Sequence, residues 1–116
     1  MLLMPRTANT YDTFTAIAEP KRRELIETLV GEELSVSRLV EVTHWSQPMV
    51  SKHLSVLKQA GLVSERKEGR QRFYRVNAQQ LKPIQIWVRQ FEKYWNQQFD
   101  QLDQYLTELQ EKGEKQ

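Results

Sequence analysis

Apolar residues recur at helical spacing along most of the chain and divide it into short amphipathic segments. A first helix is predicted over residues 11–18. A second begins at Glu19 and Pro20, because proline suits the first helical turn and an acid there favours the positive end of the helix dipole. Its apolar stripe over residues 25–30 stops at Gly31, a residue type common just after a helix.

Two short helices joined by a tight turn are predicted next. Ser35 can cap the first and Ser46 the second, since a serine hydroxyl accepts a hydrogen bond from the backbone of the first turn. The second helix carries Val50, Leu54 and Leu57 at positions i, i+4 and i+7, which face inward together. This arrangement is typical of a helix-turn-helix.

One segment, between residues 62 and 76, departs from helical spacing. Residues 63–67 and 70–76 have the composition of strands and flank Glu68-Gly69, a compact turn signal. The segment predicts a two-stranded β-hairpin whose tip is basic and polar.

The longest helix is predicted from Pro83 to about Gln110 and is followed by a polar tail, 111–116. From Val88 onward its apolar residues step by three and four, close to a heptad seam. The expected fold class is therefore mainly α, with about five helices and a two-stranded hairpin. We expect one domain over 1–116, in which 11–77 forms the core and 78–110 a dimerisation helix.

The outward face of the second helix of the pair is short and polar, which would let it enter a DNA major groove about 12 Å wide. The side chains of this helix predicted to contact DNA are Gln47, Met49, Ser51, Lys52, Ser55 and Lys58. The alternative is an amphipathic core helix whose polar face is only solvated.

Charge is distributed unevenly, although the net charge is only +2. Residues 46–76 carry seven cations against two acids, whereas the chain from Phe91 onward carries three lysines against six acids. Arg70 and Arg72 on the hairpin are expected to contact the sugar-phosphate backbone, and Gln71 to probe a groove. The basic hairpin favours DNA binding over the purely structural alternative.

Six of the eleven aromatic residues lie in the last predicted helix, which is too long to bury them all against so small a body. We therefore expect a dimer interface with contributions from the first helix and from residues 1–4. The predicted interface residues are Phe14, Ile17, Trp87, Phe91, Trp95, Phe99, Leu102 and Leu106. An apolar effector could also occupy this surface, but nothing in the sequence requires one.

Several classes of protein have no support in the sequence. Cysteine is absent, which excludes disulfides and thiolate chemistry. No apolar run is long enough to cross a membrane, and the first four residues are too short for a signal peptide, so a cytoplasmic protein is expected. No catalytic set or phosphate-binding glycine loop stands out, and no cofactor, metal or enzymatic activity is predicted.

Three stretches together resemble one known family. AIAEPKRR at 16–23, WSQPMVSKHLSVLKQAGLV at 45–63 and EGRQRFYRVN at 68–77 are similar to the ArsR family of winged-helix repressors. With LKPIQIW at 81–87, they resemble its metal-independent branch, whose members often regulate their own operons. The resemblance implies a dimer held by the first and last helices, with a recognition helix at 46–60 and a wing at 63–76.

Features of the family's metal sensors are missing. Such sensors use cysteine pairs near the recognition helix or Asp and His sets on the last helix. This chain has no cysteine, and its last helix carries Asp100 and Asp103 but no histidine. The prediction is a homodimeric DNA-binding repressor on an inverted-repeat operator; a protein-interaction module that has lost DNA binding and a small-molecule sensor are the alternatives.

Smaller expectations concern residues near the helix-turn-helix. His44 stands in the turn where a glycine is common, so a left-handed backbone is expected there. Trp45 is expected to fill the core between the two helices, and His53 to be packed and hydrogen-bonded. The basic run 21–23 is interpreted as a solvated helix start rather than a second DNA contact.

Overall fold

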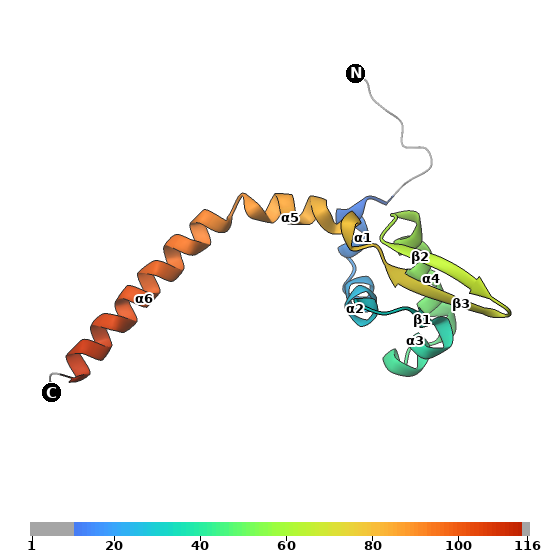
Figure 1. The fold of residues 1–116 in the computed structure, drawn as a ribbon, viewed down its shortest axis with the longest axis horizontal. Helices are drawn as coiled ribbons and strands as arrows, with labels where there is room; N and C mark the ends of the chain where they lie inside the picture. The colour runs from blue at the N-terminus through green and yellow to red at the C-terminus, as the bar shows by residue number, and fades with distance from the viewer. Residues whose placement is uncertain (1–10, 115–116) are drawn as a thin grey trace, which may run out of the picture. The chain divides into compact units, whose positions relative to one another are not determined.

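The computed structural model describes residues 11–114, so the predicted contribution of residues 1–4 lies outside the described part of the chain. Figure 1 shows the order of the elements, which form two compact units: the first ends at Pro83 and the second begins at Ile84. The first unit contains the helix-turn-helix and the wing, and the second contains most of the C-terminal helices.

The first two helices begin where the sequence places capping groups. In α1 (Thr13–Ile17) the Asp12 carboxylate accepts from the backbone N–H of Thr15 at 2.8 Å. The helix α2 (Pro20–Leu29) begins where it was predicted to, and the Glu19 side chain caps it by accepting from the backbone N–H of Lys21 at 3.2 Å. The predicted stop is also found, since Gly31 adopts a φ of 87° just beyond the end of the helix.

The helix-turn-helix consists of α3 (Val36–Thr43) and α4 (Gln47–Gln59), each capped by the predicted serine. Between them His44 has φ 63° and ψ 20°, which confirms the left-handed turn residue. Its backbone N–H donates to the Val40 carbonyl at 2.9 Å. This bond satisfies an end carbonyl of α3 and helps hold the strained turn.

A Schellman motif terminates α4. Gly61 has a φ of 81°, and its N–H donates to the Lys58 carbonyl at 3.0 Å. The N–H of Leu62 donates to the Leu57 carbonyl at 2.9 Å, while the Leu62 side chain is fully buried. The chain thereby leaves the helix directly into the first strand of the wing.

The β-structure differs from the prediction in having three strands rather than two. The strands β1 (Leu34–Ser35), β2 (Val63–Glu68) and β3 (Gln71–Val76) form an antiparallel sheet in the order β1-β3-β2. Leu34 pairs with Tyr74 across β1 and β3. The first strand is only two residues long, too short for any alternation to reveal it, and only its pairing with β3 defines it.

The turn of the hairpin is also one residue later than predicted. Glu68 pairs with Gln71, so Gly69 and Arg70 form the two-residue loop. Gly69 has a φ of 62° at the first loop position, which matches the glycine requirement of a type II′ turn. Glu68 therefore ends β2, and Arg70 stands at the tip.

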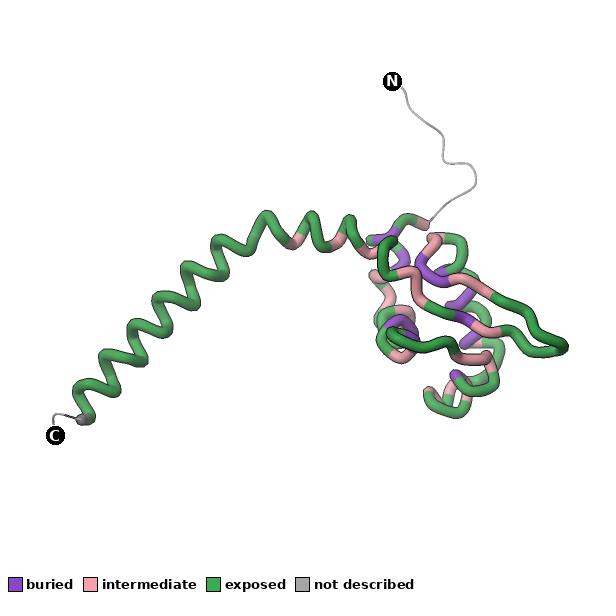
Figure 2. The backbone as a smooth tube through the Cα atoms, viewed as in Figure 1, coloured by how far each residue is buried: buried purple, intermediate pink, exposed green. Residues whose placement is uncertain are grey.

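The core lies in the first unit, where α2, α3, α4 and the wing meet. Figure 2 shows the buried positions gathered there, whereas the helices from Glu92 onward are exposed along the described residues. Val50, Leu54 and Leu57 are fully buried, as their spacing predicts. The fully buried core also contains Ala16, Leu25, Leu29, Leu39 and Leu62.

The predicted single C-terminal helix is wrong: a 3₁₀ turn (Ala78–Leu81) is followed by α5 (Lys82–Arg89) and α6 (Glu92–Glu114). At the break the N–H of Phe91 donates to the Val88 carbonyl at 2.9 Å, an i→i−3 bond that interrupts the α-helical ladder. Residues 90 and 91 are neither glycine nor proline, so the sequence carries no signal for the break. This division gives residues 11–114 six α-helices instead of about five.

Candidate nucleic-acid interface

The predicted recognition helix α4 is built so that its two faces have opposite character. Ser46 caps it by accepting from the Met49 N–H at 3.3 Å, which leaves the outer face of the first turn open. Gln47, Ser51, Lys52 and Ser55 are all exposed on this helix. The helix can therefore present short polar side chains outward while its apolar face holds it to the core.

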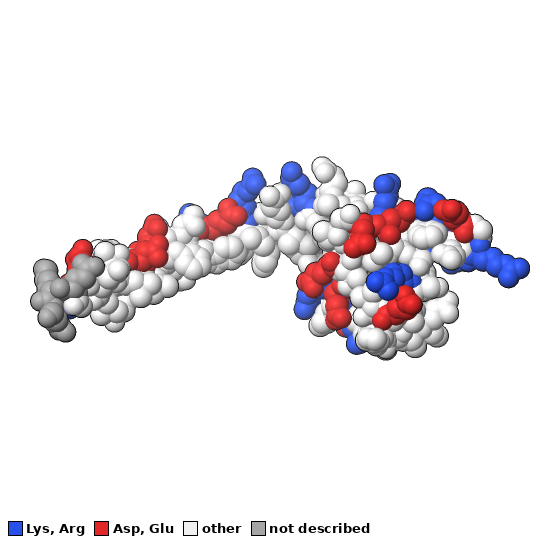
Figure 3. All heavy atoms as spheres, turned by 60° about the horizontal axis from the view of Figure 1, so that its bottom comes forward, with Lys and Arg blue, Asp and Glu red and all other residues white. Residues whose placement is uncertain are grey.

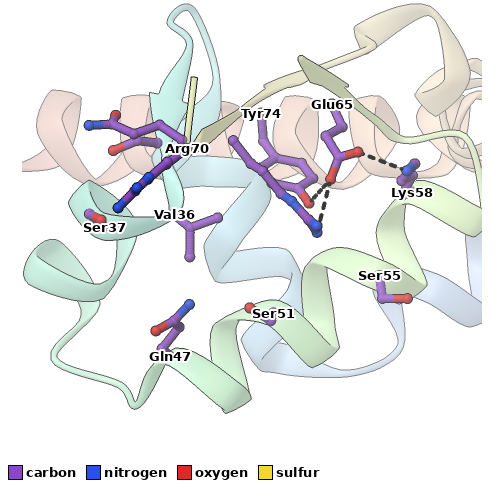
Figure 4. A pocket seen from close by; sticks show the side chains of 12 residues that line it. Val36, Ser37, Gln47, Ser51, Ser55, Lys58, Glu65, Arg70 and Tyr74 are labelled. Carbon is purple, nitrogen blue, oxygen red and sulfur yellow. Dashed lines mark hydrogen bonds and ion pairs between the residues drawn. The ribbon is translucent and has the colours of Figure 1, made fainter. Parts of the chain in front are cut away.

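A polar groove of about 510 Å³ lies between α4 and the wing. Its walls are the N-terminus of α3, the outward face of α4 and the two strands of the wing (Figure 4). The structure brings seven predicted DNA-contacting residues to this groove: Gln47, Ser51, Ser55, Lys58, Arg70, Gln71 and Arg72. Met49 and Lys52 do not line it; Met49 is half-buried and Lys52 is exposed elsewhere on α4.

The groove also contains residues that the sequence did not single out as part of a site. Ser35, Val36 and Ser37 come from the start of α3, and Glu65 and Tyr74 from the wing. The sequence marked Ser35 only as a helix cap. No local pattern indicates that Glu65 and Tyr74 meet α4, because strand pairing and the packing of α4 on β2 bring them together.

Glu65 is the centre of an ion-pair cluster on the groove wall. Its side chain is only 12% exposed, and it accepts from the Tyr74 hydroxyl at 2.6 Å and from Lys58 Nζ at 3.1 Å. Arg72 Nη1 lies 3.7 Å from the same carboxylate. The hydrogen bonds from Tyr74 and Lys58 lower the pKa of Glu65, while burial and the hydrogen bond to Glu65 raise the pKa of Tyr74 to about 12.

A second cluster occupies the other side of the wing. Arg66 donates to both carboxylate oxygens of Glu33, at 2.8 and 3.1 Å, and also bonds Glu68. The same guanidinium lies over the Phe73 ring, 4.8 Å from its centroid. These bonds raise the pKa of Arg66 and lower that of Glu33.

Four cations of the helix-turn-helix and wing have no carboxylate within 4.0 Å among the described residues: Lys52, Lys67, Arg70 and Arg75. Of these, Arg75 is still near enough to Glu33 for its charge to help lower the pKa of that carboxyl. Figure 3 shows basic side chains gathered at the tip of the wing. The tip and the exposed face of α4 therefore carry the positive charge that remains uncompensated by nearby acids.

Comparison with known proteins identifies the family to which this chain belongs. The model described as "Bacterial regulatory protein, arsR family" matches residues 19–65. The transcriptional repressor SdpR of Bacillus subtilis is 31% identical over 80 residues, which span 69% of this chain and 89% of SdpR. The chain belongs to the arsR family.

Two further comparisons agree with this membership. The repressor SmtB of Mycobacterium tuberculosis is 39% identical over 61 residues, spanning 53% of this chain and 45% of SmtB. The crystal structure of a "possible transcriptional regulator for arsenical resistance" superimposes with a TM-score of 0.62 at 37% identity, covering 74% of this chain and 86% of that one. This member of the arsR family is therefore a DNA-binding transcriptional regulator, not an enzyme, and the predicted winged helix-turn-helix is confirmed.

The basic run at residues 21–23, which is part of a stretch that resembles the arsR family, has a structural role in this chain. Arg22 Nε donates to the Ala16 carbonyl at 2.6 Å, and Arg23 Nη1 donates to the Ile17 carbonyl at 2.8 Å. Lys21 lies over the Trp45 ring, 4.7 Å from its centroid. The arginines thus satisfy the end carbonyls of α1, a role that the composition does not indicate, while Arg23 stays exposed and Lys21 and Arg22 are half-buried.

His53 is packed in the way the sequence suggested. It is 7% exposed, and Arg22 Nη1 lies 3.4 Å from its Nδ1, which must accept because a guanidinium only donates. Trp45 packs against the core and meets the His53 ring edge-on at 6.5 Å. Burial and then the positive charge of Arg22 lower the pKa of His53.

The residues predicted to form a dimer interface differ in their surroundings. In α1, Phe14 is exposed, whereas Ile17 is half-buried and packs against the core of its own chain. In the C-terminal helices the large apolar side chains are exposed: Trp87, Phe91, Trp95, Phe99, Leu102 and Leu106. The side of these helices seen in Figure 3 has long uncharged stretches between its charged groups.

Two other kinds of site were sought in residues 11–114. Within this part of the chain, no three His, Asp or Glu side chains gather in a way that could hold a metal ion. None of the described helices is both long and apolar enough to span a bilayer.

Proposed function

We propose that this regulator is a repressor that binds an inverted-repeat operator as a homodimer. The observation that carries the proposal is the groove between α4 and the wing, which joins seven of the nine predicted DNA-contacting residues. A helix with short outward side chains fits a major groove, and a basic loop beside it can reach across the adjacent sugar-phosphate backbone. Because DNA is the ligand, we place the protein in the cytoplasm.

The two walls of the groove, α4 and the wing, would make different contacts with DNA. Gln47, Ser51 and Ser55 would read base edges or nearby phosphates from α4, with Lys52 reaching beyond them. Arg70 would contact the sugar-phosphate backbone from the wing tip, and Gln71 would probe a groove. Arg70 and Lys52 should contribute most to affinity, because neither has a carboxylate partner within 4.0 Å among the described residues.

The exposed apolar residues of α5 and α6 support the homodimer. These helices have a row of large apolar side chains and no buried position. Removing such a row from water by packing it against another apolar surface is favourable. A two-fold partner would cover this row with the same residues of a second copy. It would also present two α4 helices to successive major grooves, about 10 base pairs apart or a multiple of that distance.

The test is selection from a random duplex pool, followed by a salt titration of the enriched sequence. If a dimer neutralises about eight phosphates, raising salt from about 50 to 200 mM weakens binding by a factor on the order of 10⁴. Lys52→Ala and Arg70→Ala should each weaken binding by about 60-fold at about 0.1 M salt, since each removes two phosphate ion pairs per dimer and each pair is worth roughly eightfold at that salt. Lys112→Ala, which removes a cation from α6, is the charge-matched control.

An enriched inverted repeat and losses specific to the two site variants would support the proposal. If no sequence is enriched, or if all three variants bind alike, the assigned DNA-contacting face is wrong. An enriched sequence without two-fold symmetry would instead exclude the proposed dimeric mode of binding.

A further inference from the structure

The groove proposed to contact DNA contains a carboxylate, whose negative charge repels DNA phosphate. Glu65 lines the groove together with Lys58 and Arg72, and the three groups form one cluster (Figure 4). Each of the two cations was predicted from the sequence to contact DNA. In the structure both are directed to a carboxylate of their own chain instead.

The carboxylate is much less exposed than its cationic partners and is hydrogen-bonded to the core. Tyr74, which is 6% exposed and part of the core, donates its hydroxyl to Glu65 at 2.6 Å. The Lys58 and Arg72 side chains are 53% and 57% exposed, so they have room to reorient toward a ligand, whereas Glu65 is only 12% exposed. A phosphate that enters the groove must therefore share these cations with a fixed anion.

We propose that Glu65 is an intramolecular competitor of DNA phosphate that limits the affinity of this regulator. By occupying Lys58 and Arg72, it leaves phosphate binding mainly to the uncompensated cations, and so reduces the part of the affinity that is independent of sequence. The inference rests on the proposed DNA-contacting groove and assigns it a residue that determines affinity and salt dependence.

A charge-matched control exists three residues away in the same strand. Glu68 also accepts from an arginine, but its partner Arg66 keeps both hydrogen bonds to Glu33 when Glu68 is changed. Glu65→Gln and Glu68→Gln therefore remove the same charge from β2, but only the first releases cations. The difference in DNA affinity between the two variants therefore measures the release of cations, separately from the general effect of removing a negative charge.

The experiment measures the affinity of the full chain for a selected duplex and for an unrelated duplex over a range of salt concentrations. Each additional ion pair with a phosphate steepens the slope of log K against log salt by about 0.9, which corresponds to roughly eightfold in affinity at 0.1 M salt. With one such ion pair added per protomer, Glu65→Gln should bind both duplexes about 60-fold more tightly than Glu68→Gln at that salt. Its slope should be steeper by about two.

Arg72→Gln made in both backgrounds is the second measurement. In the wild-type chain it should weaken DNA binding by only about twofold, whereas in the Glu65→Gln background it should cost clearly more, because Arg72 is then available to a phosphate. Equal affinities and slopes for Glu65→Gln and Glu68→Gln, or weaker binding by Glu65→Gln, would overturn the inference. If Glu65→Gln does not fold, an Arg72→Gln loss in the wild-type chain as large as that of Arg70→Ala would overturn it.

These outcomes separate the inference from the function on which it rests. Loss of binding in Arg70→Ala tests the groove, and loss in Lys52→Ala tests the exposed side of α4 beside it; neither variant involves Glu65. A groove confirmed by those variants, together with equal behaviour of Glu65→Gln and Glu68→Gln, rejects the competitor role alone.

Discussion

Replacing Phe99 by alanine should dissociate the proposed homodimer. Phe99 is 63% exposed in the middle of α6, within an apolar row that steps by four, three and four from Trp95 through Leu102 to Leu106. The row has no partner within α6, because the described side chains of this helix are all exposed. A second copy of the row is the partner that the proposed function supplies.

The expected loss follows from the exposed area. A phenylalanine side chain offers about 200 Å², so truncation of one that is 63% exposed removes about 100 Å² of coverable apolar surface. At about 25 cal/mol per Å², this is about 2.5 kcal/mol per protomer and about 5 kcal/mol per dimer. The dimer dissociation constant should therefore rise by a factor on the order of 10³ to 10⁴.

Sedimentation velocity over a range of protein concentrations measures this constant directly. Tyr105→Ala is the control, since Tyr105 is an aromatic of α6 that is 58% exposed but lies about 90° around the helix from the centre of the row. Equal dissociation of the two variants, or a monomeric wild-type chain at all concentrations, would refute the assignment of this row to the dimer interface.

Two further predictions concern the helix-turn-helix. His44→Gly should unfold at a temperature roughly 4 °C above that of His44→Ala, because glycine relieves about 1 kcal/mol of left-handed strain that alanine retains; equal melting temperatures would show that the turn is unstrained. The lowered pKa of His53 means that the unfolded chain binds more protons below about pH 6.5, so the free energy of unfolding should fall as pH drops from there through the folded-state pKa. Chemical unfolding at a series of pH values should show this decline in the wild-type chain and a shallower one in His53→Gln, and parallel profiles would exclude His53 as its source.

Local chemistry predicts much of this protein because many decisive interactions span only a few residues. Ser35 and Ser46 can be recognised as caps because each bonds a backbone N–H three residues ahead. The inward face of α4 follows from helical spacing alone, and so does its polar outward face. The left-handed backbone of His44 could be anticipated because this residue stands in the turn where a glycine is common.

Tertiary structure decided the features that join residues distant in sequence. The strand β1 exists only because Leu34 meets Tyr74, forty residues further along the chain. The same pairing of strands and packing of α4 place Glu65 against Lys58 and Arg72, so two cations predicted to be free for DNA are already engaged.

The basic run 21–23 shows the same limit. Its composition suggests a solvated surface, whereas the fold directs Arg22 and Arg23 to the carbonyls that end α1. A sequence reports how many charges a segment carries and how they are spaced. Which acid or carbonyl lies within hydrogen-bonding distance of each charge depends on the packing of the helices and strands, and at the groove that packing separates the engaged cations from those left for DNA.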